Sequence, residues 1–473
     1  MASGAPVIEN LASSLRARLT GSEVLTQSSP GYDDAIKRWS DAAVKRAGLI
    51  LLATNATDIS QAVLFAQENR LDLAVRGGGH SVAGTSSSDG GLVIDLSRMR
   101  KVTVDKEKKT ITAQGGALWA DVDTAAAEHA LATVGGTVNH TGIGGLTLGG
   151  GYGWLSPKYG LTIDNLLSVT IVLADGRIVT ASETENPDLF WAVRGAGHNF
   201  GVAVDFTYQG YDQPNEVFCG MLAFTPDKLE AIIEVLNSHL QNPDVNSGSV
   251  CVFAPTPSSP TPLVIPIIFY NGTEEVARKR FAGLYALGPV VDETGMAPYV
   301  KVNSLMNQSA VHGGRRSFKG VFFSPPLRPA FARQVFESFS EKIQSEPEMA
   351  GSALILEFFD MKKICERSLT DTAFANRGES RNGVLTTRWE SPEKDGAMRA
   401  WAREVQMMFK KEMDTHGSKR TDSVPQYINY AEPGDSVVPN IYGVNTERLQ
   451  HLKWKYDPNN VFGKMNPIKP VQP

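Results

Sequence analysis

Two glycine-rich stretches constrain this chain more than any other part of its sequence. The first is 76–81, RGGGHS, and the second is 142–153, GIGGLTLGGGYG. Glycine lets backbone N–H groups converge in conformations that other residues avoid, and it lets the chain approach a ligand closely. Because both stretches adjoin segments with strand character, we interpret them as a cradle for an anion, and a cofactor pyrophosphate is the obvious one.

The familiar nucleotide-binding motifs do not fit these stretches. Neither has the G-x-G-x-x-G spacing between a strand and a helix, and no G-x-x-x-x-G-K-[ST] sequence occurs. A Rossmann or P-loop protein is therefore disfavoured. Tight turns in a β-rich fold would explain one stretch alone, whereas two stretches with an embedded histidine favour a ligand site.

The embedded histidine is His80, and three interpretations are open for it. A histidine after a glycine turn is usually a hydrogen-bonded or solvent-exposed polar residue. Metal binding would need further ligands, and His140 and His198 lie far off in the sequence, so we expect no metal site. An imidazole can also act as a nucleophile toward an electrophilic carbon, such as the 8-methyl group of a flavin.

Composition excludes several classes of protein. The 473 residues are 42% hydrophobic and 21% charged, which is typical of a soluble globular protein with room for two domains. A net charge of -5 favours neither nucleic acid nor an anionic membrane as a partner. We see no signal peptide or membrane span and expect a cytoplasmic protein. The three cysteines are too few for a disulfide framework or a zinc site and are expected to be buried thiols: Cys219, Cys251 and Cys365.

Local patterns divide the chain into three regions. From 46 to 211, short β-branched runs alternate with glycine-rich turns. There, 71–75 predicts a strand leading into the first glycine stretch, Thr57 is a candidate N-cap for a helix, and Asp175-Gly176 predicts a hairpin. From about 215 to 418, glycine is sparser, and helical periodicity appears over 228–240 and 330–344. Residues 446–456 near the end predict another helix.

Several motifs together resemble those of a known family. They are 76–80, 90–96, 142–153 leading into 158–165, 186–195, and, near the end of the chain, 427–430, 442–445 and 455–459. These stretches are similar to the berberine-bridge-enzyme-like FAD-linked oxidases of the vanillyl-alcohol-oxidase superfamily. The resemblance covers most of 46–213 and 425–468.

The resemblance implies an α+β, two-domain vanillyl-alcohol-oxidase-type fold. A discontinuous FAD-binding domain of the PCMH type would comprise residues 1–213, with its core at about 43–213. Residues 214–421 would form an inserted α+β substrate-binding domain. Residues 422–473 would return to the FAD-binding domain.

The resemblance also implies how FAD is held. His80 would be the 8α-histidyl attachment point. Many members carry a second, cysteinyl tether, but Val138 stands at that position, so a single covalent link is expected. The other residues expected to bind the cofactor are Arg76, Gly77, Gly78, Gly79, Ser81, Gly115, Gly116, Gly142, Gly144, Gly145, Gly149, Gly150, Val202 and Asn445.

The implied reaction is hydride transfer from a substrate C–H bond to flavin N5, followed by reoxidation with O2 to H2O2. Tyr152 and Tyr427 match tyrosines that reach the active site in family members, and we name them as candidate catalytic residues. A tyrosine acts as a base only if its pKa falls toward neutrality. The acid/base pair that members carry before a tryptophan is missing here, because Asn382 and Val384 stand at those positions.

These observations favour an oxidase of a small alcohol, hydroxylated metabolite or amine, with a small-molecule substrate and O2 as partners. An FAD-dependent dehydrogenase and a carbohydrate oxidase are alternatives within flavin chemistry. A different class, a non-redox cyclase or a binding protein with structural flavin, is also open because one fold can host divergent functions. The substrate and the oligomeric state are not encoded in any motif.

Overall fold

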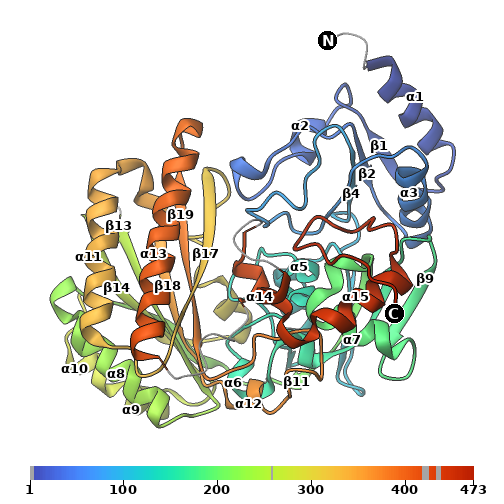
Figure 1. Ribbon diagram of the computed structural model, residues 1–473. Coiled ribbons are helices and arrows are strands. Elements are labelled where there is room, and N and C mark those ends of the chain that lie inside the picture. Colours follow the sequence, from blue (N-terminus) through green and yellow to red (C-terminus); the bar gives the residue numbers. More distant parts are fainter. Residues whose placement is uncertain (1–4, 257–258, 418–425, 433–437) are drawn as a thin grey trace.

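The computed structural model describes residues 5–256, 259–417, 426–432 and 438–473. In Figure 1 the molecule has two parts that lie side by side, one formed mainly by the blue, cyan, green and red segments and the other mainly by the yellow-green, yellow and orange segments. Helices and sheets occur in both parts, which confirms the predicted α+β class. Among these residues, no helix combines the length and apolar character needed to cross a membrane.

A four-stranded sheet of order β1-β2-β4-β3 delivers the chain to the first glycine stretch. Its strands are β1 (Glu23–Leu25), β2 (Leu49–Leu52), β3 (Leu73–Arg76) and β4 (Leu92–Asp95). β2, β4 and β3 run parallel. Helices α1 (Ala5–Arg16) and α3 (Ala56–Glu68) share one hydrophobic cluster with this sheet. Because β3 ends at Arg76, Gly77 begins the loop that carries His80.

The start of α3 differs from the sequence prediction. The N-cap is Asn55, whose side chain accepts a hydrogen bond from the backbone N–H of Asp58 at 2.8 Å. Asn55 has extended backbone angles, as an N-cap requires, whereas Thr57 already lies inside the first helical turn. The prediction of Thr57 as the cap was therefore wrong by two positions.

A second, antiparallel sheet has the order β5-β6-β10-β8-β9. Its strands are β5 (Val102–Asp105), β6 (Thr110–Gln114), β8 (Leu166–Val172), β9 (Ile178–Ser182) and β10 (Val202–Gln209). Val172 pairs with Ile178, which confirms the hairpin at Asp175-Gly176. The helices of this region are α4 (Trp119–Ala127), α5 (Ile143–Leu148), α6 (Ser156–Tyr159) and α7 (Pro187–Ala196). The second glycine stretch thus begins α5, with Gly142 as its N-cap.

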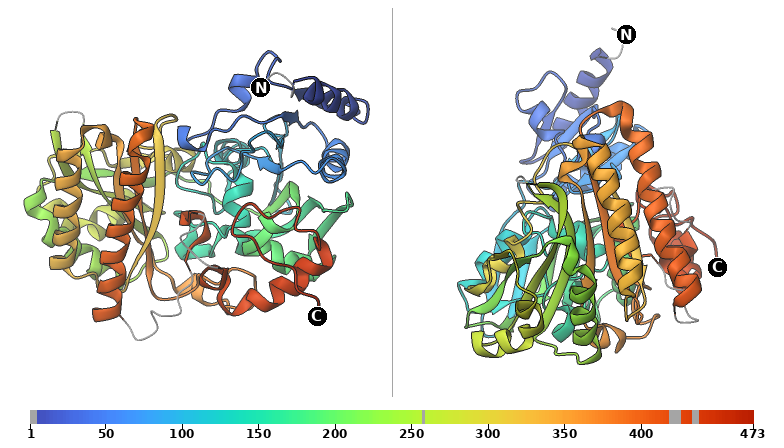
Figure 2. Two further views of the ribbon diagram at one scale, coloured as in Figure 1. Left: turned by 45° about the horizontal axis from the view of Figure 1, so that its top comes forward. Right: turned by 90° about the vertical axis from the view of Figure 1, so that its left-hand side faces the viewer.

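The other part is built on a large antiparallel sheet of order β15-β12-β14-β13-β18-β19-β17, with β16 paired to β12. Its strands are β12 (Val217–Ala223), β13 (Ser247–Thr256), β14 (Ser259–Tyr270), β15 (Val291–Asp292), β16 (Gly295–Ala297), β17 (Arg315–Phe323), β18 (Ala353–Phe358) and β19 (Arg381–Trp389). Figure 2 shows α11 (Pro329–Ser345) and α13 (Asp395–His416) packed side by side on this sheet. Helix α8 (Leu229–Gln241) joins them on the same face.

The described chain has further helices and two short strands. They are α2 (Tyr32–Ala35), β7 (Leu131–Ala132), β11 (Tyr211–Asp212), α9 (Glu274–Arg280), α10 (Ala282–Ala286), α12 (Lys362–Cys365), α14 (Val438–Tyr442) and α15 (Thr446–Tyr456). The domain limits of the sequence analysis stay predictions. The limit at 421/422 lies outside the described residues.

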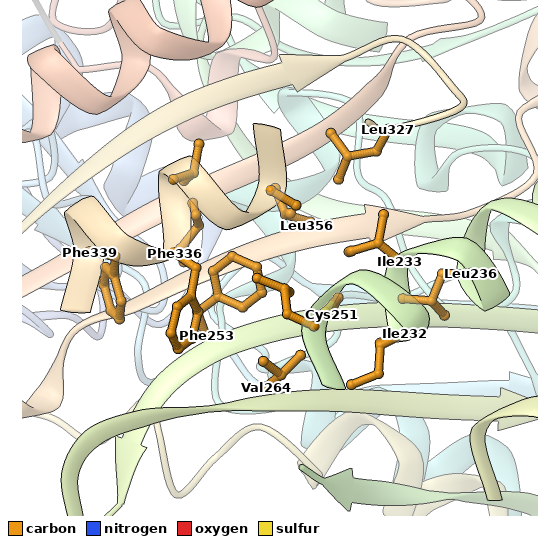
Figure 3. Packing of buried hydrophobic residues seen from close by; sticks show 14 of the residues in the cluster. Ile232, Ile233, Leu236, Cys251, Phe253, Val264, Leu327, Phe336, Phe339 and Leu356 are labelled. Carbon is orange, nitrogen blue, oxygen red and sulfur yellow. The ribbon is translucent and has the colours of Figure 1, made fainter. Parts of the chain in front are cut away.

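Side chains of the large sheet alternate between two environments. On β18, Leu354, Leu356 and Phe358 enter the core under the helices, and Figure 3 shows Leu356 beside Phe336 of α11 and Phe253 of β13. The residues between them therefore point to the opposite face. That face is turned toward the first part of the molecule, where Trp154 packs against strand residues such as Val250 and Phe269.

The cysteines follow the prediction in two cases out of three. Cys251 is buried in the core shown in Figure 3, and Cys219 is buried on a neighbouring strand. Cys365, at the end of α12, is exposed, so the expectation of a buried thiol was wrong there. The helix that carries Cys365 is only one turn long and covers no apolar core with its last residue.

The end of the chain returns to the first part of the molecule. Leu449, Leu452 and Tyr456 of α15 belong to the same hydrophobic cluster as residues of α7, and Figure 1 shows these helices next to each other. A buried lysine fastens this return. The Lys453 ammonium donates to the carboxylate of Asp457 at 2.7 Å and to the backbone carbonyl of Asn199 at 2.6 Å.

We expect Lys453→Met to lower the free energy of unfolding by about 3 kcal/mol, because it leaves the fully buried Asp457 carboxylate without its counter-ion. Chemical denaturation measures the change. The control is Lys455→Met, which removes an exposed ion pair with Asp188 and should cost less than about 1 kcal/mol. Equal effects of the two substitutions would show that the buried pair does not hold the C-terminal segment.

Candidate active site

A cavity of about 370 Å³ lies between the two parts of the molecule. The first glycine stretch and residues 141–148 line one side, and β18 and β19 line another. Residues 427–431 and the segment around Lys464 close it from the C-terminal end of the chain. The volume is in the range of small-molecule and cofactor sites.

The two glycine stretches touch each other at the wall of this cavity. A Cβ atom placed on Gly78 would lie 2.3 Å from the backbone nitrogen of Gly142, so both positions exclude any side chain. Gly79 has a φ of 71°, which favours glycine. A Cβ on Gly145 would meet no atom within 4 Å, because this backbone faces open space. The arrangement leaves a strip of bare backbone on which a diphosphate group can lie closely.

The structure brings most of the residues predicted from sequence to the cavity and leaves others behind it. Those that line it are Gly77, Gly78, Gly79, His80, Ser81, Gly115, Gly142, Gly144, Gly145, Tyr152 and Tyr427. Those outside its lining are Arg76, Gly116, Gly149, Gly150, Val202 and Asn445. A contact of either set with the cofactor stays a prediction.

The residues behind the lining shape it. Arg76 forms an ion pair with the buried carboxylate of Asp95 at 2.5 Å, at the point where β3 passes into the His80 loop. Gly150 has a φ of 117° and packs against the ring of Phe374. The amide of Asn445 donates to three backbone carbonyls of residues 369–373. We infer that these residues hold the backbone of the site in place.

His80 is surrounded by aromatic rings. Its Nε2 lies 2.7 Å from Nδ1 of His140, and the indole of Trp39 stacks on its ring with centroids 5.0 Å apart. His312 contacts both histidines, and the ligand nitrogens of the three lie within 4.8 Å of one another. Sequence distance had hidden this contact, because 60 residues separate His80 from His140. Three imidazoles at this spacing can bind a cation. His80 also lines the glycine-walled cavity, so the same side chain can instead contact a cofactor there.

Electrostatics keep His80 uncharged. Burial lowers the pKa of His80 well below its usual value, and the neighbouring His140 and His312 act in the same direction. Burial also lowers the pKa of His140. Both rings are therefore neutral near pH 7, which is the form in which imidazole has a free electron pair for bond formation.

The two candidate tyrosines are buried, and their hydroxyls form hydrogen bonds. Tyr152 Oη donates to the side-chain oxygen of Asn376 at 2.7 Å, and Tyr427 Oη accepts from the amide of Asn429 at 2.9 Å. Burial raises the pKa of Tyr152 and of Tyr427 far above the usual value. A raised pKa makes a phenol a poor base, so both are better suited to orienting other groups than to taking a proton.

Glu357 is a carboxylate in the cavity that the sequence analysis missed. It lies on β18, is 7% exposed, and its Oε1 accepts a hydrogen bond from Tyr430 Oη at 2.6 Å. Burial raises the pKa of Glu357 to about 7, although the hydrogen bond from Tyr430 acts against this. The sequence does contain one signal for this site. Glu357 stands between Leu356 and Phe358, and a lone acid in an apolar strand requires a partner when it is buried.

The surroundings of Glu357 are mainly apolar. Nearby strand positions that line the same cavity are Val250, Ala353, Ile355, Val384 and Thr386. The rings of Tyr152, Tyr427 and Tyr430 follow one another edge to face, with centroids 4.9 and 4.7 Å apart, and lead to the carboxylate. This end of the cavity therefore offers one buried acid–base group in an apolar pocket.

Comparisons with known proteins agree with this geometry. Residues 47–182 match the model of the FAD binding domain, and residues 426–469 match the berberine and berberine-like model. The FAD-linked oxidoreductase pgmH of Aspergillus terreus is 36% identical over 97% of this chain and 95% of its own length. The chain belongs to the berberine-bridge-enzyme-like FAD-linked oxidoreductases. It is an FAD-dependent oxidoreductase with a vanillyl-alcohol-oxidase-type fold, as the sequence motifs predicted.

A curated sequence and a solved structure similar to this chain are both named as hydroxynicotine oxidases. The (R)-6-hydroxynicotine oxidase of Paenarthrobacter nicotinovorans is 34% identical over 70% of this chain and 72% of its own length. The crystal structure of 6-hydroxy-D-nicotine oxidase from Arthrobacter nicotinovorans superposes with a TM-score of 0.82 at 25% identity, covering 96% of this chain and 99% of that one. Both names describe the oxidation of a hydroxynicotine, a small molecule.

The residues present fit FAD. Bare backbone along Gly78, Gly142 and Gly145 accommodates a diphosphate, and the buried hydroxyl of Ser86, which lines the cavity, has no hydrogen-bond partner in the described structure. Lys464 from the C-terminal segment also lines the cavity, and its ammonium forms an ion pair with the carboxylate of Asp72. None of the described residues that line the cavity is a cysteine, and Val138 lies in the wall.

We expect Glu357 to contribute a decline in the free energy of unfolding as the pH rises from 4.5 to 7, whereas the buried neutral histidines contribute in the opposite direction. In this window the unfolded state has lost the proton that the folded state retains, so ionisation opposes folding. Glu357→Gln should remove up to about 3 kcal/mol of this decline in denaturation measured across the window. Asp123→Asn serves as the matched case, because burial also raises the pKa of Asp123 to about 7 outside the cavity. An unchanged pH profile in Glu357→Gln would contradict the raised pKa.

Proposed function

We propose that this protein is an FAD-linked oxidase of a small alcohol, hydroxylated metabolite or amine, with the flavin attached only through His80. The cavity carries the proposal, because it places one buried carboxylate in a mainly apolar wall on the side facing the glycine cradle. Residues 1–213 and 422–473 would hold the cofactor, and residues 214–421 the substrate. The bound flavin would accept a hydride at N5 and pass the electrons to O2, giving H2O2.

The residues of the chain would divide the remaining work. Glu357 would take the proton from the substrate hydroxyl or ammonium group, since a base with a pKa near the working pH transfers protons efficiently. Tyr430 would hold the carboxylate by the hydrogen bond to Oε1. Tyr152 and Tyr427 would orient the substrate at the end of the row of three tyrosine rings. The apolar side chains of the strands that line the cavity would exclude water.

The proposal favours a small substrate over a carbohydrate. Sugar binding needs many hydrogen-bonding groups, whereas Val250, Ile355 and Val384 offer apolar surface around a single acid. In the family that this chain resembles, a single tether accompanies smaller substrates. Val138 stands in place of the second, cysteinyl tether, so this feature favours a small substrate as well. The activity named for the nicotine-oxidising relatives supports the same class.

We expect His80→Ala to abolish covalent flavin, because the described residues that line the cavity include no cysteine for a second link. Acid-precipitated wild-type protein should stay yellow, and acid-precipitated His80→Ala should be colourless. His312→Ala, which removes a neighbouring imidazole, should stay yellow. Retention of covalent flavin in His80→Ala would place the tether elsewhere.

We expect small alcohols or amines to bleach the flavin anaerobically, and Glu357→Gln to slow this bleaching by about 100-fold through loss of the base. In the wild type, the bleaching rate should rise with pH through about 7 as Glu357 ionises. Asp123→Asn, a buried carboxyl outside the cavity, should bleach at the wild-type rate.

The same assay separates the alternatives. Bleaching only by oligosaccharides would indicate a carbohydrate oxidase. Bleaching without H2O2 release when air is admitted would indicate a dehydrogenase that uses another electron acceptor. Product formation without bleaching would indicate a non-redox cyclase with structural flavin. Each of these results would overturn the proposed oxidase.

A further inference from the structure

The contact between His80 and His140 does more than position the proposed tether. A histidine that forms a bond to carbon must have one ring nitrogen with a free electron pair and must later lose the proton on the other nitrogen. In this structure Nε2 of His80 lies 2.7 Å from Nδ1 of His140, which engages Nε2 and leaves Nδ1 as the bond-forming atom. This inference rests on the proposed attachment of flavin at His80.

We propose that His140 is the general base that promotes covalent attachment of the flavin to Nδ1 of His80. His140 is suited to this task because burial keeps its ring neutral, as it does that of His80. The carbonyl of Ala310 accepts a hydrogen bond from the His140 ring. Since Nδ1 of His140 faces His80, we assign Nε2 of His140 as that donor, and Nδ1 is then the proton acceptor.

Aromatic packing holds His80 in the required orientation. Trp39 stacks on it at an interplanar angle of 16°, and the indole Nε1 donates to the carbonyl of Ala310 at 2.6 Å. The guanidinium of Arg316 covers Trp39 at 4.2 Å from the ring centroid. Ala310 therefore fixes both Trp39 and His140, which aligns the two histidine rings before the flavin reacts.

The step balances with molecular oxygen as the oxidant. A C–H bond of the flavin 8-methyl group breaks and its proton leaves to solvent, while a bond forms between Nδ1 of His80 and the 8α carbon. The proton on Nε2 of His80 passes to Nδ1 of His140. The electron pair of the broken C–H bond remains on the flavin as a two-electron reduction, and O2 removes it as H2O2.

The test measures covalent flavin directly and needs no substrate. Wild-type protein and variants are incubated with excess FAD, and the flavin that stays with acid-denatured protein is followed with time. We expect His140→Leu to bind FAD without attaching it, with the attachment rate lowered by about 100-fold, as is usual for loss of a general base. His312→Leu, which removes the third imidazole but no hydrogen bond to His80, should attach flavin at close to the wild-type rate.

Chemical rescue separates a base from a structural role. Added imidazole should restore attachment in His140→Gly, whereas His140→Gln, which can accept a hydrogen bond but cannot take the proton, should stay slow. Attachment at the wild-type rate in His140→Leu, or no response of His140→Gly to imidazole, would overturn the role of His140. Covalent flavin in His80→Ala would instead overturn the tether itself. Stoichiometric metal on the three histidines in place of covalent flavin would contradict both.

Discussion

The close approach of Gly78 and Gly142 is the constraint on which the rest of the site depends. The backbones of two loops meet there with no room for a Cβ on either side. One loop follows β3 and carries His80, and the other begins α5 directly after His140 and Thr141. Because the loops touch, the two histidines meet at 2.7 Å and bare backbone lines a single cavity. A side chain at either glycine would separate the proposed cofactor cradle from His80, the proposed tether.

The other half of the site depends on the large sheet. Alternation along β18 sends Leu356 into the helix-covered core and Glu357 toward the cavity. The C-terminal segment supplies Tyr430, whose hydroxyl holds the Glu357 carboxylate. The buried Lys453 ion pair keeps that segment on the first part of the molecule. The candidate active site is therefore assembled from three regions of the chain.

The predictions from the sequence are correct where interactions between neighbouring residues decide the structure. The turn at Asp175-Gly176 forms the expected hairpin, and 446–456 is the expected helix α15. The predictions are wrong where two nearby residues could cap the same helix, or where burial depends on the rest of the fold. Asn55 caps α3 in place of Thr57, and Cys365 ends a one-turn helix at the surface. Glu357 and His140 were missed because their partners, Tyr430 and His80, lie 73 and 60 residues away.

The sequence by itself determined the family, the α+β class, the glycine cradle and His80 as the candidate tether, because glycine spacing and local motifs specify these without distant contacts. It also predicted that the usual acid/base pair of the family is absent, with Asn382 and Val384 in its place. Only the tertiary structure showed that a carboxylate on the neighbouring strand, Glu357, lies in the cavity with its pKa raised by burial. Burial and contacts between remote segments set that chemistry, and they exist only once the chain has folded.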